Sequence, residues 1–496
     1  MYKHDQNQLE FENFSLPFSG KLRSDNRWVK LSKIIPWGDF EKAYSKSLAG
    51  SGFGSPAISV RVALGTLIIK ERLGSSDRET VEQIRENPYL QYFLGFKEYQ
   101  DKEPFHPTML VSFRKRISKE MLGKINDTLH KKSLSGKSEF SDDDDNDSPP
   151  KNKGKLLVDA TCTPADITFP TDLKLLNKAR EKSEEIIDLL HKPHKGIKKK
   201  PRTYRKVARK NFLSAAKSKR LSKGKRRKVI RKQLGYLERN LKSIKKLSKC
   251  SSLFLLSNPE YKNLLVISEI HRQQKWMYEQ RENRICDRIV SVSQPHVRPI
   301  KRGKANASTE FGAKISASLI DGYCFLDCLS WDNYNECGDL QHQIETYLGK
   351  FGFYPRSVHA DKIYRTRDNI KYCNSHGIRL SGPRLGRPPS DQLKRKELRN
   401  QARQDEIDRI PIEGKFGQGK RRFGLSKIMC KLAQTSETAI AITFLVMNLE
   451  KLLKVFIFLF SNRTQFIWFG WICEKMTAKY LQKNMVKCRK DYLYVV

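Results

Sequence analysis

Three acidic side chains, far apart in the sequence, are the candidates for chemistry. Asp159 lies in LLVDAT, Asp361 ends SVHAD, and Glu413 lies in RIPIEGKFGQGK. Cleaving or transferring a phosphodiester requires charge stabilisation at the attacking and the leaving oxygen. Two divalent cations ~3.5–4 Å apart supply it when hard oxygen ligands hold them. An Asp after a strand is most often a turn or cap residue, so neither aspartate is specific by itself.

The spacing around Glu413 adds specificity. Arg409, Glu413 and Lys420 form the pattern R-x3-E-x6-K. In a helix these offsets place the three side chains at about 0°, 40° and 20° around the axis, on one face. A metal-binding carboxylate between two cations suits a site that grips a phosphodiester. Three glycines follow Glu413 and each costs ~1 kcal/mol against Ala, so the surroundings must hold this helix.

The elements that must position these residues alternate between strand-like and helix-like patterns. LLVDATCTPADI predicts a short strand with Asp159 at its tip, and residues 172–190 predict a helix. RIVSVSQPHV, residues 288–297, predicts a strand, and residues 312–331 predict a hairpin that turns at Asp321-Gly322. Further predicted elements are a strand within 353–361 and helices over 390–409 and 439–453. Strands on both sides of a large insertion, closed by helices, indicate one α/β core split by residues 171–285.

The insertion carries much of the positive charge of the chain. The 496 residues include 96 Lys or Arg and 54 Asp or Glu, a formal charge of +42. Between His191 and Cys250 there are 25 Lys or Arg and one acid, with apolar residues recurring among them. This pattern predicts basic helices that release counterions from a DNA backbone. An RNA-associated arm or a localisation signal is the alternative. The candidate DNA-binding residues here are Lys200, Arg202, Arg205, Lys206, Arg226 and Arg227.

The N-terminal 132 residues have a different pattern, with apolar residues on a helical period. A break at Gly74-Ser75-Ser76 gives a spacing like that of a helix-turn-helix, which favours a DNA-binding domain over 1–132. Plain packing or dimerisation remains the alternative. Residues 133–153 contain an acidic run, two prolines and almost nothing apolar, so a disordered linker is expected.

Secretion and membrane insertion are not expected. The first ten residues are polar, and the ten cysteines form no C-x-x-C pair, which fits reduced thiols in a cytoplasmic protein. The apolar stretch 452–471 is interrupted by Lys454 and Arg463. A charge at the bilayer centre costs roughly 2.5–3.5 kcal/mol, so we expect no membrane span and no membrane partner.

Taken together, these motifs resemble a known family. An Asp in V-D-A-T, an Asp in H-A-D-K and R-x3-E-x6-K, in this order, resemble the DDE transposases of small bacterial insertion sequences, in the group with the signature Y-x2-R-x3-E-x6-K. The position of the signature Tyr is Glu406 here. The resemblance covers most of 1–450 and includes TPADITFPTDLKLLNKARE (163–181), KPRTYRKVARK (200–210), QPHVRPIKRGKA (294–305) and TEFGAKIS (309–316).

The resemblance implies an RNase H-like core, a mixed sheet flanked by helices, made of residues 154–170 and 286–450. Residues 451–496 would form a C-terminal tail. Asp159, Asp361 and Glu413 would be the catalytic triad and hold two Mg²⁺ or Mn²⁺ ions. Arg409 and Lys420 would contact the phosphates at the transposon end.

The implied reaction is cleavage of double-stranded DNA at inverted-repeat ends to free 3′-hydroxyls, followed by their attack on target DNA. Two ends must meet, so a homodimer in a synaptic complex, associated with the bacterial nucleoid, is expected. Two alternatives remain open: an RNase H-like nuclease without strand transfer, and a catalytically inactive transposase-derived DNA-binding protein.

Overall fold

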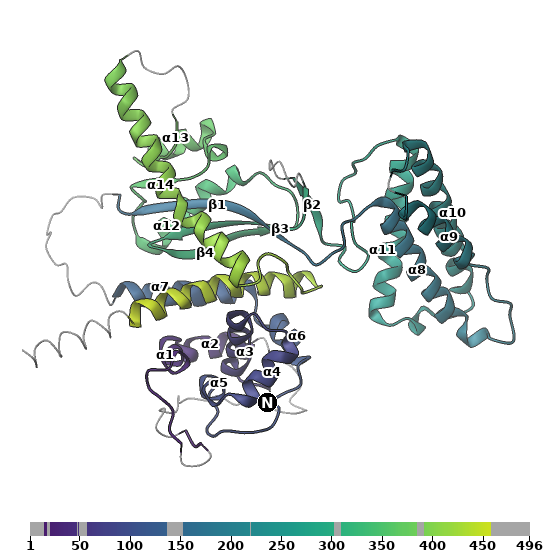
Figure 1. Cartoon of the computed structure of the whole chain (residues 1–496), viewed down its shortest axis with the longest axis horizontal. Coiled ribbons are helices and arrows are strands. Elements are labelled where there is room, and N and C mark those ends of the chain that lie inside the picture. Colours follow the sequence, from purple (N-terminus) through teal and green to yellow (C-terminus); the bar gives the residue numbers. More distant parts are fainter. Residues whose placement is uncertain are drawn as a thin grey trace, which may run out of the picture. The chain divides into compact units, whose positions relative to one another are not determined.

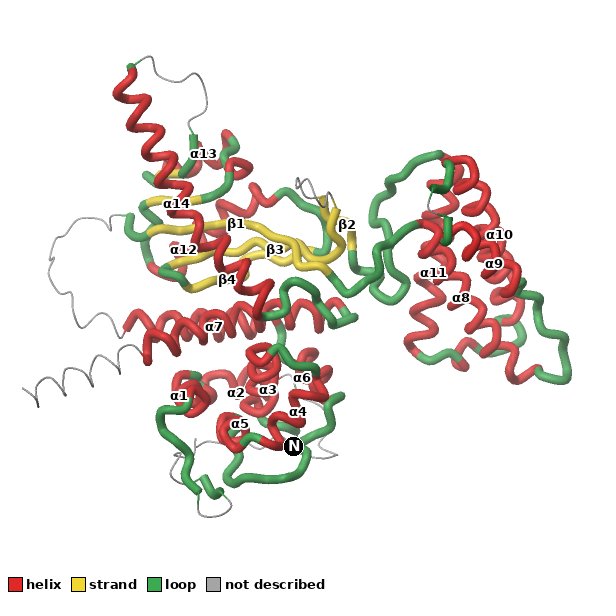
Figure 2. The backbone as a smooth tube through the Cα atoms, viewed as in Figure 1, coloured by secondary structure: helices red, strands yellow, loops and turns green. Residues whose placement is uncertain are grey.

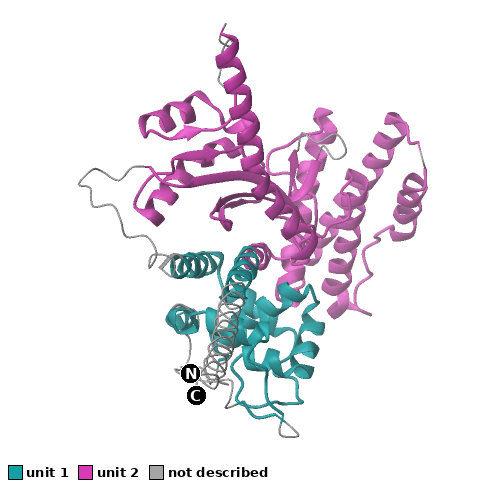
Figure 3. Cartoon of the chain, turned by 60° about the vertical axis from the view of Figure 1, so that its left-hand side comes forward, with its two compact units in different colours: residues 1–146, 444–496 teal, residues 147–443 magenta. Residues whose placement is uncertain are grey.

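The chain divides into two compact units, Met1–Asn146 with Phe444–Val496, and Asp147–Thr443 (Figure 3). A computed structural model describes residues 14–16, 20–46, 48, 57–135, 152–218, 220–301, 309–383 and 391–457. Most of the predicted linker and of the predicted C-terminal tail lie outside these ranges. Within the described residues, no helix is both long enough and apolar enough to cross a bilayer.

The first unit is helical where it is described, as its sequence predicts (Figure 1). Its core surrounds α3, whose Ala63, Leu64 and Ile69 are fully buried. Gly74 ends α3 in the left-handed conformation, with φ at 67°, and the side chain of Ser76 caps α4. The predicted helix pair with a break at 74–76 is therefore confirmed. The helices are α1 (Arg27–Ile34), α2 (Trp37–Lys46), α3 (Val60–Leu73), α4 (Asp77–Glu86), α5 (Pro88–Phe93), α6 (Met109–Arg116) and α7 (Lys119–Ser135).

The second unit contains a mixed sheet, yellow in Figure 2. Its strands are β1 (Lys155–Pro164), β2 (Arg298–Lys301), β3 (Thr309–Ile320), β4 (Tyr323–Ser330), β5 (Ser357–His359) and β6 (Arg379–Leu380). The order is β2-β3-β1-β5-β6, and β4 also pairs with β3. β3 is antiparallel to β1, β2 and β4, whereas β5 is parallel to β1 and to β6.

Local sequence explains two features of the sheet. Asp321 and Gly322 have φ of 48° and 77°, which a two-residue hairpin turn requires, so the predicted hairpin between β3 and β4 is confirmed. Gly312 faces Pro164 across β1 and β3. A side chain at Gly312 would overlap the carbonyl oxygen of Thr163, so the close approach of the two strands requires glycine there.

Two strand predictions are wrong, and both errors concern pairing. Residues 288–297 form no strand, because the N–H of Ile289 donates to the Oε1 of Gln273 on a helix rather than to a neighbouring strand. Asp159 is not at the tip of its strand but in the middle of β1. β1 continues because its antiparallel pairing with β3 extends as far as Pro164.

Four long helices lie between β1 and β2 in the sequence. They are α8 (Asp172–His191), α9 (Arg205–Ala216), α10 (Lys223–Leu247) and α11 (Asn258–Gln280). The predicted helix over 172–190 is thus confirmed, and the basic stretch forms helices. A cluster of buried leucines and isoleucines, including Leu176, Leu237 and Ile270, holds α8, α10 and α11 together. The basic residues are therefore carried by a folded helical bundle (Figure 1).

The remaining helices follow the hairpin. They are α12 (Leu340–Phe351), α13 (Arg367–Ser375), α14 (Gln392–Arg422) and a helix over residues 433–457. The predicted helices over 390–409 and 439–453 are confirmed in type. α14 packs against β1, β3 and β5, so it reaches the middle of the sheet (Figures 1 and 2).

Candidate active site

Asp159 lies on β1, and Asp361 follows the neighbouring parallel strand β5. β5 pairs with only the first three residues of β1, opposite Lys155 to Leu157. Asp159 therefore lies on β1 just past the end of β5, and its Oδ1 accepts the N–H of Ala160. Asp361 follows β5 by two residues, and its Oδ1 accepts the N–H of Lys362 at 2.6 Å. The end of β5 thus brings both carboxylates to the same part of the sheet.

α14 brings the third carboxylate to them. The helix is continuous through Arg409, Glu413 and Lys420, so the R-x3-E-x6-K spacing places the three residues on one face. Nη1 of Arg409 lies 3.1 Å from Oδ1 of Asp361, and its Nη2 lies 2.7 Å from Oε1 of Glu413. One guanidinium therefore bridges two of the three predicted carboxylates, beside the strand that carries the third.

The charges of these residues affect one another. Burial raises the pKa of Asp159 to about 6, and the negative charges of Asp361 and Glu413 add to the rise. The Ala160 N–H and Arg409 oppose it. Burial alone would lower the pKa of Arg409, but the carboxylates that surround it raise its pKa overall. The site concentrates three carboxylates around one guanidinium, an arrangement that favours binding of further positive charge.

Lys420 joins the end of α14 to β1. Its Nζ donates to Oγ1 of Thr161 at 2.8 Å, two residues beyond Asp159 on β1. Thr161 was not among the residues predicted for the site. Its i+2 spacing from Asp159 on a strand, which places both side chains on one face, was the available signal.

A second group of polar residues, also missed, joins the first half of α14 to the sheet. Asp408 forms an ion pair with Lys155, with 2.7 Å between Oδ2 and Nζ. Asp405 forms one with Arg379, with 2.9 Å between Oδ1 and Nη2. The fully buried ring of His359 lies between them, 3.7 Å from Asp405 and 3.8 Å from Asp408. Burial lowers the pKa of His359. The H-A-D-K motif was the signal for His359, and the position next to Arg409 was the signal for Asp408.

The donor set suits a hard divalent cation, although the present distances are not those of a metal site. Among the described residues, no three His, Cys, Asp or Glu side chains lie close enough together to hold a metal ion. The three carboxylates nevertheless supply only oxygen ligands, which Mg²⁺ and Mn²⁺ prefer. The guanidinium of Arg409 lies between two of them.

The six predicted DNA-binding residues of the insertion fall into three groups. Lys200 and Arg205 both pair with Asp188, at 2.5 and 2.6 Å, so their charges are partly neutralised within the protein. Lys206 and Arg226 are exposed and form no ion pair within the described residues. The guanidinium groups of the other two stack on tyrosine rings, Arg202 on Tyr204 at 4.5 Å and Arg227 on Tyr278 at 3.9 Å.

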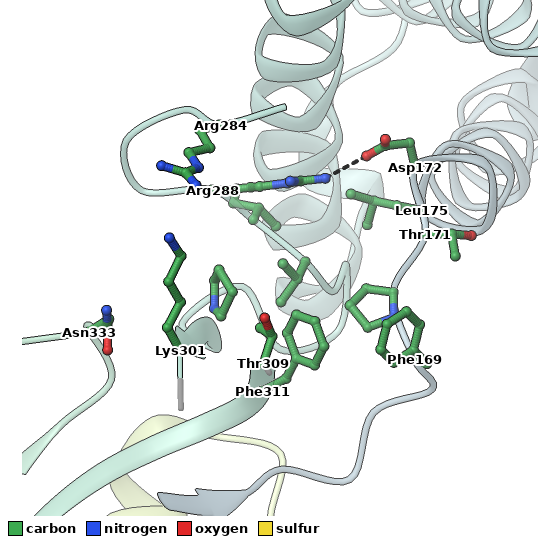
Figure 4. A pocket seen from close by; sticks show the side chains of 14 residues that line it. Phe169, Thr171, Asp172, Leu175, Arg284, Arg288, Lys301, Thr309, Phe311 and Asn333 are labelled. Atoms are coloured by element: carbon green, nitrogen blue, oxygen red, sulfur yellow. Dashed lines mark hydrogen bonds and ion pairs between the residues drawn. The ribbon is translucent and has the colours of Figure 1, made fainter. Parts of the chain in front are cut away.

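A pocket of about 320 Å³ lies elsewhere in this unit, where the chain leaves β1 for α8 (Figure 4). Phe169 and Phe311 form an aromatic wall with ring centroids 5.5 Å apart, and Arg284 and Lys301 lie on the opposite side. Arg288 pairs with Asp172 at 2.6 Å. None of the three candidate carboxylates lines this pocket. Asp361 and Glu413 are instead about half exposed at their side chains.

Parts of the chain are similar to known proteins. A family model described as "Transposase DDE domain" matches residues 358–450, the segment that contains Asp361 and Glu413. A second, described as "Transposase domain", matches residues 17–116. An "Uncharacterized protein ORF8 in nfe locus" of Rhizobium meliloti is 32% identical over 155 residues, which are 30% of this chain and 68% of that protein. No solved structure matches significantly.

Proposed function

Because the chain belongs to the DDE transposases of insertion sequences, we propose that it cleaves DNA at the ends of such an element and joins the freed 3′-hydroxyls to target DNA. The contact of Arg409 with both Asp361 and Glu413, beside Asp159, is the observation that carries this proposal. Three carboxylates, from β1, the segment after β5 and α14, are the type of ligand set that two-metal phosphoryl transfer uses.

The proposed catalytic core is RNase H-like. A mixed sheet flanked by helices and interrupted after β1 by the bundle α8–α11 supports this assignment. We place the core at residues 154–170 and 286–450 and the basic insertion at 171–285.

In this site Asp159, Asp361 and Glu413 would hold two Mg²⁺ or Mn²⁺ ions. When bound, the ions would stabilise charge on the attacking and the leaving oxygen of the phosphodiester. Arg409 would contact the phosphate at the element end, since a guanidinium that already bridges two carboxylates is suited to bidentate oxygen recognition. Lys420 would add positive charge near Asp159.

The basic bundle would hold the duplex beside the cleaved end. Lys206 and Arg226 are the best-suited residues, because their charges are exposed and no carboxylate within the described residues pairs with them. The N-terminal unit would bind the inverted repeats. Its helix α4 has four carboxylates against two arginines, so we assign that contact to another of its surfaces. Two ends must meet, so the working form would be a homodimer on DNA in the bacterial cytoplasm.

An end-joining assay tests the proposal. The full chain would be mixed with an oligonucleotide carrying an element end, a supercoiled target plasmid and Mg²⁺. We expect cleavage and joined product from the native sequence. Asp361→Asn, at an exposed position, should abolish both and leave end binding unchanged. Cleavage without joining would identify a nuclease, and binding without cleavage an inactive DNA-binding protein. Unchanged cleavage by Asp361→Asn would refute the site assignment.

A further inference from the structure

Two polar contacts join β1 to α14 on either side of the candidate carboxylates. On β1, Lys155 and Thr161 lie before and after Asp159. Nζ of Lys155 lies 2.7 Å from Oδ2 of Asp408, and Nζ of Lys420 donates to Oγ1 of Thr161 at 2.8 Å. On α14, Asp408 lies before Glu413 and Lys420 lies after it. The two contacts are therefore found on both sides of the candidate carboxylates.

The lengths of the two elements match between these contacts. From Lys155 to Thr161 the strand rises about 20 Å, at ~3.3 Å per residue. From Asp408 to Lys420 the helix rises about 18 Å, at ~1.5 Å per residue. Both contacts therefore form together in one register of helix against strand. Sliding α14 by one turn would move Glu413 by ~5.4 Å and break both of them.

This part of α14 needs such support because its sequence is poor in helix formers. Pro411 lies inside the helix, and Gly414, Gly417 and Gly419 follow within nine residues. Proline removes a hydrogen-bond donor and clashes with the preceding turn, and each glycine disfavours a helix interior. The position of Glu413 is therefore set by the contacts of the helix and not by its intrinsic stiffness.

We propose that these two contacts act as a register clamp that sets the spacing of Asp159 and Glu413, and that Thr161 and Asp408 are positioning residues of the site. The expected effect of the clamp on metal binding rests on the proposed function, whereas the two contacts and their effect on the position of α14 do not. The Thr161 contact is the stronger constraint, since Thr161 is only 6% exposed. Lys155 is 59% exposed at its side chain, so its ion pair is weakened by solvent.

The buried neighbours of Asp408 strengthen its end of the clamp. His359 on β5 lies 3.8 Å from Asp408 and 3.7 Å from Asp405. Asp405 in turn accepts the N–H of Gly382 at 3.2 Å and an ion pair from Arg379. The first half of α14 is thus held to β1, β5 and β6 before the proline is reached.

Thr161→Val in the full chain tests the clamp, because it keeps the shape and β-branch and removes only the hydroxyl. Thr163→Val is the matched control: its hydroxyl lies on the same face of β1 but donates to the carbonyl of Ala313 on β3. Hydrogen exchange of the segment 408–420 should speed up in Thr161→Val and stay unchanged in Thr163→Val. Thr161→Ser should restore the native rate.

Mn²⁺ binding, measured from the electron paramagnetic resonance signal of the free ion, gives the second readout. In the double variant Thr161→Val, Asp408→Asn we expect Mn²⁺ to bind about tenfold more weakly, as when a residue that orients a metal ligand is lost. The affinity for an oligonucleotide that carries an element end should stay unchanged. Unchanged exchange of 408–420 in Thr161→Val would overturn the clamp, as would an equal effect in the control. A native chain that neither binds Mn²⁺ nor cleaves would instead count against the proposed function, while the exchange result would still decide the clamp.

Discussion

Replacing Arg409 by Gln separates metal binding from catalysis. The substitution removes the guanidinium that contacts Asp361 and Glu413 at 3.1 and 2.7 Å. Both carboxylate side chains are 53% exposed, so each contact contributes only ~0.2–1 kcal/mol. Together they amount to ~0.4–2 kcal/mol, or about 2- to 30-fold in an equilibrium constant.

A cation that binds these two carboxylates must first displace the guanidinium. Without DNA, Arg409→Gln should therefore bind Mn²⁺ about 2- to 30-fold more tightly than the native chain. Cleavage of an element end should nevertheless fall, because the variant lacks the proposed phosphate contact. The two measurements are expected to move in opposite directions.

The assay is a Mn²⁺ titration of the full chain followed by electron paramagnetic resonance, beside a cleavage assay at saturating Mn²⁺. Arg403→Gln is the control, since it removes the same charge from an exposed position of α14. Mn²⁺ binding by Arg409→Gln no tighter than by Arg403→Gln would refute the argument that Arg409 occupies the place of a metal ion.

Three further predictions follow from the described contacts. Replacing the exposed Lys206 and Arg226 together by Gln should reduce the slope of log K against log salt for duplex binding by up to ~1.8, whereas replacing the two cations that share Asp188 should change it less. Burial raises the pKa of Asp327 to about 6, so the folded chain keeps a proton that the unfolded chain releases, and stability falls as the pH rises from about 4 to 6. Asp327→Asn should remove this penalty. In urea titrations we expect the free energy of unfolding to rise by up to ~3 kcal/mol at pH 8 and to change little at pH 4. Equal gains at both pH values would contradict the assignment of this pH dependence to Asp327. Gly312→Ala should lower the free energy of unfolding by ~1–3 kcal/mol, because the methyl group of the alanine would overlap the carbonyl oxygen of Thr163. Thermal unfolding measures the change, and an unchanged stability would show that β1 and β3 can move apart there.

Features set by neighbouring residues could be predicted from the sequence. The hairpin at Asp321-Gly322 and the helix break at Gly74 depend on residues that accept positive φ, and that preference is local. A helix was predicted over 390–409, and the spacing of Arg409 and Glu413 puts them on one face where that helix continues through both.

Features set by pairing could not be predicted in the same way. The sequence 288–297 has the composition of a strand, but Gln273 satisfies the N–H of Ile289, so no strand forms. β1 pairs with β3 as far as Pro164, and this pairing places Asp159 in mid-strand. From the sequence, Lys200 and Arg205 were predicted to bind DNA. In the folded bundle each of them also forms an ion pair with Asp188.

For the candidate site, the sequence by itself determined which side chains could do chemistry and that Arg409 and Glu413 share a helix face. Only the tertiary structure decided that this face meets the end of β5, because a contact between distant segments depends on how helix and sheet pack. It also decided the partners of Lys420 and Asp408, which no spacing along the chain encodes. Residue types and local geometry set the chemistry available, and packing set the distances at which it can be used.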